Sequence, residues 1–112
     1  NPGFRSRIAH HINFPDYSND ELLEIGEIMI SDMNYKLNEK SREAFAEYIK
    51  LRRKQPHFAN ARSIRNAIDR IRLRQANRVF KTSKGPINSD VLSIIDEVDV
   101  RKSRVFSGGI DS

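Results

Sequence analysis

Apolar residues recur at helical spacing along the chain, and the first such stretch follows Ser18. Ser18 and Glu21 form an S-x-x-E capping box, in which each side chain binds the backbone N–H group of the other residue. The apolar and small residues that follow are Leu22, Ile25, Gly26, Met29 and Met33. This spacing predicts a helix that starts after Ser18. Gly26 marks either a close helix–helix contact or a position without constraint.

Two further helices are predicted. One runs from about Glu39 to Lys54 and is ended by Pro56. Its buried stripe is expected to hold Phe45, Tyr48, Ile49 and Arg52. The other begins after Asn60, a residue well suited to cap a helix N-terminus, and extends to about Phe80. Its stripe comprises Ile64, Ala67, Ile68, Ile71 and Val79.

The two ends of the chain have different patterns. Residues 8–14 alternate apolar and polar positions up to Pro15, which predicts one short strand whose partner strands lie outside this sequence. After the break at Gly85, a short fourth helix is expected to follow position 88 or 89, using Val91, Leu92 and Ile95. The segment from Val100, with Ser-Gly-Gly at 107–109, is expected to be a loop. The fold class is therefore mainly α: a remnant strand, then a four-helix unit.

Composition narrows the choice of functions. The chain has 112 residues, about the size of one domain, and contains no cysteine, which excludes disulfides, thiolate metal sites and a cysteine nucleophile. No apolar run approaches the ~18 residues that span a bilayer. The net charge is +5, but residues 52–84 carry 11 basic side chains and a single acid, Asp69. Such asymmetry points to an anionic partner: nucleic acid, a membrane surface or phosphate.

The arginine-rich third helix is the strongest physical signal. Arg62 is expected about two residues past Asn60, where free backbone N–H groups and the positive end of the helix dipole favour an anion. A guanidinium there suits a phosphate group. Arg65 lies one turn further on. The alternative is an ordinary solvated helix face.

Other chemistry is weakly indicated. Only Phe58 and Phe80 interrupt the basic segment, so a base-stacking platform for nucleic acid is not expected, although periodicity alone leaves a helix-turn-helix open. His10 and His11 are adjacent on the predicted strand and point to opposite faces, so they cannot easily share a metal ion. With His57 they read as ordinary polar residues. Residues 92–97, LSIIDE, resemble a Walker B strand, but an amphipathic helix that ends in acids explains them better.

Several stretches resemble AAA+ ATPases. Residues 1–7, NPGFRSR, resemble the arginine-finger segment, and residues 14–17, FPDY, resemble the exit from the last core strand into the helical lid. Residues 58–66, FANARSIRN, resemble the sensor-2 motif at the start of the third lid helix. Residues 100–106 with Gly108 and Gly109 are similar to the C-terminal tail of the CbbX-like, red-type Rubisco activases. The stage V sporulation protein K branch is the nearest alternative.

The resemblance implies a piece of a hexameric, ATP-driven remodeller that acts on the Rubisco large subunit, with ribulose 1,5-bisphosphate as activator, in plastid stroma or bacterial cytoplasm. It implies that Arg7, with Arg5 as fallback, is an arginine finger offered to a neighbouring subunit. It also implies that Arg62, with Asn60 beside it, meets ATP in its own subunit. No nucleic acid or membrane partner is expected. The other arginines of the third helix should face nucleotide, neighbouring subunits or solvent.

The resemblance also predicts boundaries and limits. Residues 1–17 would hold the finger and last core strand, 18–99 the lid, and 100–112 the tail. Walker A, Walker B, sensor 1 and the pore loop are absent from this sequence, so ATP with Mg²⁺ would be bound mainly by upstream residues, and this chain alone is expected to be inactive. Excess positive charge suggests a second anion site at Arg65 or Arg70. A basic nucleic-acid-binding module and an oligomerisation module stay open as alternatives.

Overall fold

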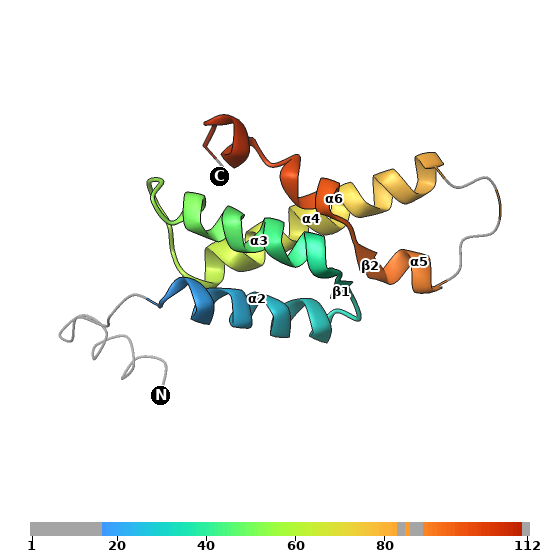
Figure 1. Cartoon of the computed structure of the whole chain (residues 1–112), viewed down its shortest axis with the longest axis horizontal. Coiled ribbons are helices and arrows are strands. Elements are labelled where there is room, and N and C mark those ends of the chain that lie inside the picture. The colour runs from blue at the N-terminus through green and yellow to red at the C-terminus, as the bar shows by residue number, and fades with distance from the viewer. Residues whose placement is uncertain (1–16, 83–84, 86–88, 111–112) are drawn as a thin grey trace.

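Three long helices form the body of the molecule (Figure 1). The computed structural model describes residues 17–82, 85 and 89–110. The long helices are α2 (Asn19–Asp32), α3 (Glu39–Arg52) and α4 (Ala61–Thr82). The short elements are β1 (Lys36–Leu37), α5 (Ser89–Ser93), β2 (Ile94–Ile95), α6 (Glu97–Arg101) and the 3-10 helix η1 (Arg104–Ser107). The strand predicted at residues 8–14 lies outside the described residues.

The predicted helix starts are confirmed where capping side chains specify them. The Glu21 N–H group donates to Ser18 Oγ over 3.1 Å, and the Ser18 N–H group donates to Glu21 Oε1 over 2.8 Å. A second capping box starts α3, where Asn38 Oδ1 accepts from the Ser41 N–H group and Ser41 Oγ accepts from the Asn38 N–H group. Each box satisfies backbone donors that the first helical turn leaves unpaired.

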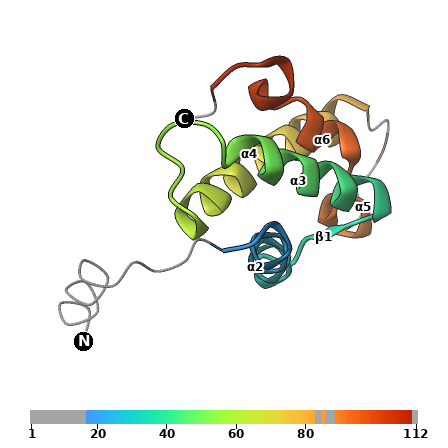
Figure 2. The ribbon, with the colours of Figure 1, turned by 60° about the vertical axis from the view of Figure 1, so that its left-hand side comes forward.

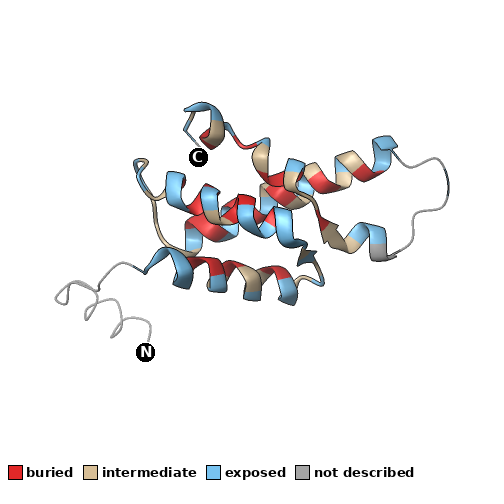
Figure 3. Cartoon of the chain, in the orientation of Figure 1, coloured by how far each residue is buried: buried red, intermediate tan, exposed pale blue. Residues whose placement is uncertain are grey.

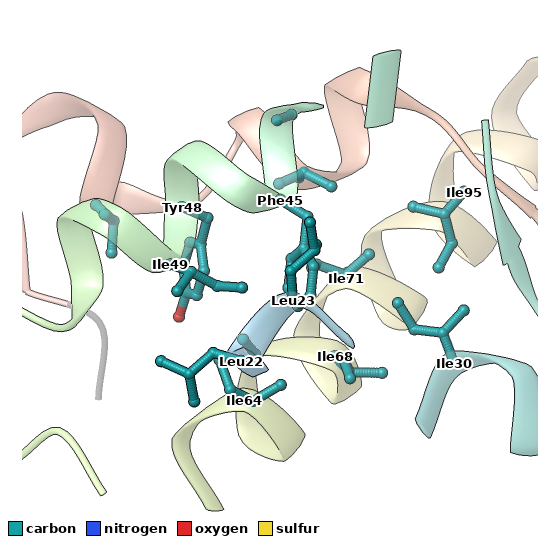
Figure 4. Packing of buried hydrophobic residues seen from close by; sticks show 14 residues of the cluster. Leu22, Leu23, Ile30, Phe45, Tyr48, Ile49, Ile64, Ile68, Ile71 and Ile95 are labelled. Carbon is teal, nitrogen blue, oxygen red and sulfur yellow. The ribbon is translucent and has the colours of Figure 1, made fainter. Parts of the chain in front are cut away.

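The core lies where α2, α3 and α4 meet, and the buried positions form one stripe on each helix (Figures 3 and 4). Phe45 and Ile49 of α3 are fully buried, as are Ile64 and Ile68 of α4. Gly26 of α2 is a real close contact, because a Cβ atom there would lie 2.4 Å from Phe45 Cε2. Of the two alternatives that the sequence left open for Gly26, the structure therefore supports the close approach of two helices.

The predicted fourth helix is confirmed at its start, because α5 begins at Ser89, but the helix ends at Ser93 and does not include Ile95. Its residues form α5, then strand β2, then α6. Strand β2 pairs in parallel with β1, with Lys36 opposite Ile94 and Leu37 opposite Ile95. Ile95 is fully buried because β2 carries it into the core. A two-residue strand has no periodicity of its own, so the apolar run resembled a short helix.

The segment from Val100 is more ordered than the loop that the sequence predicted. Val100 lies within α6 and is fully buried, and Val105 of η1 is only 4% exposed. Gly108 ends η1 with a left-handed backbone, φ 86°. The chain then returns to the loop between α3 and α4, as Figure 2 shows. The mainly α class is confirmed, and none of the described helices is long and apolar enough to cross a membrane.

Candidate functional site

The loop between α3 and α4 sets the start of the arginine-rich helix. Two of its residues have left-handed backbones, His57 (φ 65°) and Asn60 (φ 47°). Ser63 Oγ accepts a hydrogen bond from the Ala59 N–H group over 2.8 Å, and the Arg62 N–H group donates to the Ala59 carbonyl over 3.1 Å. These bonds close the first turn of α4 and present Arg62 at its N-terminal end.

The prediction that the Asn60 side chain caps α4 is wrong. A capping side chain normally sits on an extended backbone, from which it reaches the free N–H groups of the first turn. The left-handed backbone of Asn60 places the side chain elsewhere, and its buried Oδ1 atom has no hydrogen-bond partner among the described residues. Asn60 instead shapes the turn into α4, and its carbonyl accepts from the Ile64 N–H group over 3.1 Å.

A pocket of about 330 Å³ opens at this end of α4. Its walls come from four parts of the chain: Arg52 at the end of α3, His57 in the loop, Arg62 and Asn66 on α4, and Ile110 from the C-terminal segment. None of the described residues that line it carries a carboxylate. The described walls of the pocket are therefore positively charged, since they hold two guanidinium groups and no acid.

Neither of the two arginines is neutralised within the described part of the chain. Arg62 is exposed and forms no ion pair there. Arg52 is only 5% exposed, yet its neighbours are a carbonyl and a ring: Nη1 donates to the Pro56 carbonyl over 3.2 Å, and Cζ lies 5.6 Å from the centre of the Phe58 ring. Burying a cation without a counter-charge is costly. An anion in this pocket would compensate both charges.

Sequence reasoning placed Arg52 in the apolar stripe of its helix but assigned it no chemistry. The sequence did contain a sign of this role. An arginine in an apolar stripe is expected to be buried, and a buried charge needs a partner group. Arg65 and Arg70, the predicted second anion site, do not line the pocket. They are five positions apart on α4, about 140° around the helix, so they do not share a face.

Arg78, near the far end of α4, forms a structural clamp. Its guanidinium binds the nearly buried Asp99 carboxylate through two bonds, Nε to Oδ1 over 2.9 Å and Nη2 to Oδ2 over 3.0 Å. It also reaches Asp96 Oδ2 over 3.2 Å. The hydrogen bond with Asp99 raises the pKa of Arg78, which stays charged. Arg74 Nη1 donates to the Asp99 carbonyl over 2.9 Å.

These contacts correct the expectation that the other arginines of the third helix face nucleotide, neighbouring subunits or solvent. Arg74 and Arg78 do not serve a nucleotide or a neighbouring subunit through these groups, because their contacts tie α4 to α6 within the chain. The acids of the Walker B-like run are likewise engaged: Asp96 with Asn38 and Arg78, and Glu97 with Arg101. Among the described residues no cluster of acids or histidines could hold a metal ion.

The remaining predicted site residues, Arg5, Arg7, His10 and His11, lie outside the described part of the chain. Tyr17 marks where that part begins. Arg53 holds it there, since Nη2 donates to the Tyr17 carbonyl and Nη1 to Asn19 Oδ1, each over 2.6 Å. The chain thus enters the helical unit beside Arg52 and the cationic pocket.

Comparison with known proteins adds a family and named relatives. The family described as AAA lid domain matches residues 18–105. Protein CbbX of Cereibacter sphaeroides is 62% identical over 112 residues, which cover all of this chain and 36% of the relative. Protein CfxQ of Xanthobacter flavus is 58% identical over the same length and is covered to 35%. The chloroplastic ribulose bisphosphate carboxylase/oxygenase activase of Cyanidioschyzon merolae is 51% identical over 106 residues, which cover 95% of this chain and 36% of the relative. The chain thus spans about a third of the length of these relatives.

Proposed function

This chain belongs to the AAA lid domain family, and from that premise we propose that it supplies the helical lid of an ATP-hydrolysing remodelling enzyme. The observation that carries the proposal is Arg62: a guanidinium at the start of a 22-residue helix that forms no ion pair with any described residue, in a pocket whose described walls hold no acid. A phosphate group there would meet the guanidinium and the positive end of the helix dipole.

ATP fits the residues present, whereas Mg²⁺ has no ligand set among the described residues. Arg62 would contact the phosphates, with Arg52 adding positive charge from another part of the pocket wall. Asn60 would act by turning the chain into α4. When bound, ATP supplies the phosphoanhydride whose hydrolysis drives the motor. The residues of this chain would bind the negatively charged phosphates of ATP and would couple ATP binding to the position of the lid.

The target that we propose for the full-length protein is red-type Rubisco. One relative is named a chloroplastic ribulose bisphosphate carboxylase/oxygenase activase, and the other two carry the names CbbX and CfxQ. A hexameric ring that pulls on the Rubisco large subunit, with ribulose 1,5-bisphosphate as activator, follows from the same likeness. Relatives from bacteria and from an alga whose activase is named chloroplastic are consistent with bacterial cytoplasm or plastid stroma. Arg65 remains the proposed second anion site, and Arg70, on another face of α4, is the weaker alternative to it.

The roles of the two site arginines complete the proposal. Arg7 would be the finger that reaches a neighbouring subunit's ATP, with Arg5 as the fallback, and Arg62 would act on the ATP of its own subunit. A nucleic-acid-binding module is less well supported, because Arg74 and Arg78 are used within the chain. An oligomerisation module would not need an Arg62 that lacks an ion pair among the described residues, in a pocket whose described walls hold no acid.

The test is ATP turnover by the full-length protein carrying Arg62→Ala, with Lys81→Ala as the matched control. Lys81 is an exposed cation at the other end of the same helix. A hydrogen bond to a charged group contributes about 1.5–3 kcal/mol, so we expect Arg62→Ala to slow turnover about 10- to 100-fold while Lys81→Ala leaves it unchanged. Equal rates for wild type and Arg62→Ala would remove the basis of the proposal.

A further inference from the structure

The C-terminal segment forms part of the wall of the Arg62 pocket. After Val105 anchors η1 in the core, Gly108 turns the chain with a left-handed backbone, and the segment reaches the pocket at Ile110. Ile110 is 60% exposed although it lines the pocket. A large apolar side chain at this position covers one side of a charged site without being packed into the core.

One hydrogen bond ties this segment to the loop that carries the site. Gln55 Nε2, in the α3–α4 loop, donates to the Gly109 carbonyl over 2.6 Å. The next residues of the loop, Pro56 and His57, line the same pocket. The α3–α4 loop therefore contacts both the pocket and the C-terminal segment, so a displacement of one can shift the other.

The segment is held firmly at its base and lightly at its end. The Gly109 N–H group donates to the Arg104 carbonyl over 2.8 Å, and the ring of Phe106 lies against Tyr48 and under the Arg101 guanidinium. Beyond Gly109, the exposed Ile110 has little buried surface to lose. Such an end can move without disturbing the core, since a segment that buries little apolar surface opens locally at a low cost in free energy.

We propose that residues 108–110 form a strap over the Arg62 pocket, held by Gln55, that closes further when an anionic ligand binds. This inference rests on the proposed function in taking the ligand to be the phosphates of a nucleotide. Coupling between two sites is reciprocal. If the bound ligand stabilises the strap, the strap must also strengthen ligand binding by the same factor, and such differences in affinity lie mostly in the dissociation rate.

The first measurement is hydrogen exchange of residues 104–110 in the full-length protein, with and without ADP or the slowly hydrolysed analogue ATPγS. We expect the amides of Gly109 and Ile110 to exchange at least about threefold more slowly with either nucleotide. Unchanged exchange at saturating nucleotide would overturn the strap.

The second measurement is the nucleotide dissociation rate of strap variants. Gln55→Ala removes the tie, and Lys54→Ala is the matched control at the exposed neighbouring position. Gly109→Val perturbs the strap from the other side, because a Cβ atom there would lie 2.9 Å from Arg104 Cβ. Both strap variants should release nucleotide about fivefold faster, the lower end of typical coupling, while the control matches wild type.

The outcomes separate this inference from the proposed function. If Arg62→Ala weakens nucleotide binding but the strap variants release nucleotide at the wild-type rate, the strap is wrong and the lid assignment stands. If Arg62→Ala changes nothing, the proposed function itself fails. Hydrogen exchange of the core amides of α3 and α4 shows whether each variant is folded. A variant is compared with wild type only when these amides exchange at the wild-type rate.

Discussion

At the scale of single residues, Gly26 gives a sharp stability prediction. A methyl group there would lie 2.4 Å from Phe45 Cε2 and 3.3 Å from Ile64 Cγ2, and both neighbours are fully buried. Overpacking a core costs about 1–3 kcal/mol, whereas alanine gains up to about 1 kcal/mol over glycine in a helix. We expect Gly26→Ala to lower the free energy of unfolding by about 1 kcal/mol in a denaturant titration.

Gly85 supplies the control for this substitution. A Cβ atom there would meet no atom of the described residues within 4 Å. Gly85→Ala should therefore leave the unfolding midpoint within error of wild type. A neutral or stabilising Gly26→Ala would mean that Phe45 can move aside and that the contact between α2 and α3 is looser than it looks.

At the scale of secondary-structure elements, the clamp between α4 and α6 is the contact whose loss should matter most. The Asp99 side chain is 1% exposed and that of Arg78 is 22% exposed, and two hydrogen bonds join them. Removing one partner of a buried pair costs about 3–5 kcal/mol, and because Asp96 would still meet the Arg78 guanidinium, the cost here should be about 3 kcal/mol. We expect Asp99→Ala to destabilise the chain by about that amount, measured by denaturant unfolding.

The exposed pair between Arg72 and Asp69 is the matched comparison. Its atoms are 3.7 Å apart and its side chains are 40% and 54% exposed. Exposed pairs contribute less than about 1 kcal/mol, so Asp69→Ala should have little effect. If the two aspartate variants were equally stable, the contacts between α4 and α6 would have to be held by the apolar core alone.

The elements also show what a sequence can predict. The long helices were predictable because each buries a stripe at helical spacing, and the Ser18–Glu21 capping box fixes where the first one starts. The pairing of β1 with β2 was not predictable, because a two-residue strand shows no periodicity and the paired residues are 58 positions apart in the sequence. For the same reason the clamp between Arg78 and Asp99, 21 positions apart, left no local sign.

The candidate site was predictable in part. The motif around Arg62 indicated its place at the start of α4, and the structure leaves that side chain without an ion pair among the described residues. The roles of Arg52 and Ile110 depend on how distant segments meet around the pocket. The left-handed backbone of Asn60 was not predicted either, because asparagine is common both as a helix N-cap and in left-handed turns.

At the scale of the whole molecule, this chain is a lid whose cationic pocket lies beside the point where the chain enters the helical unit. The proposed motor needs two arginines that serve different nucleotides. Arg62 would act in its own subunit, and Arg7 would act on the neighbour's ATP. A guanidinium offered to the transferred phosphate is typically worth ~10³–10⁵ in rate, so loss of Arg7 should be severe in a ring made only of mutant subunits.

The most direct measurement is ATP turnover in mixed rings of the full-length protein. Arg7→Ala subunits mixed with subunits whose P-loop cannot bind ATP should regain activity, because an intact finger can then serve an intact nucleotide site. Arg62→Ala subunits in the same mixture should not regain activity. The Arg62 defect and the P-loop defect each disable the nucleotide site of the subunit that carries them, so no site in the mixture is intact. Recovery of activity by Arg62→Ala in the mixture, to the same extent as by Arg7→Ala, would contradict the assignment of Arg62 to its own subunit's ATP.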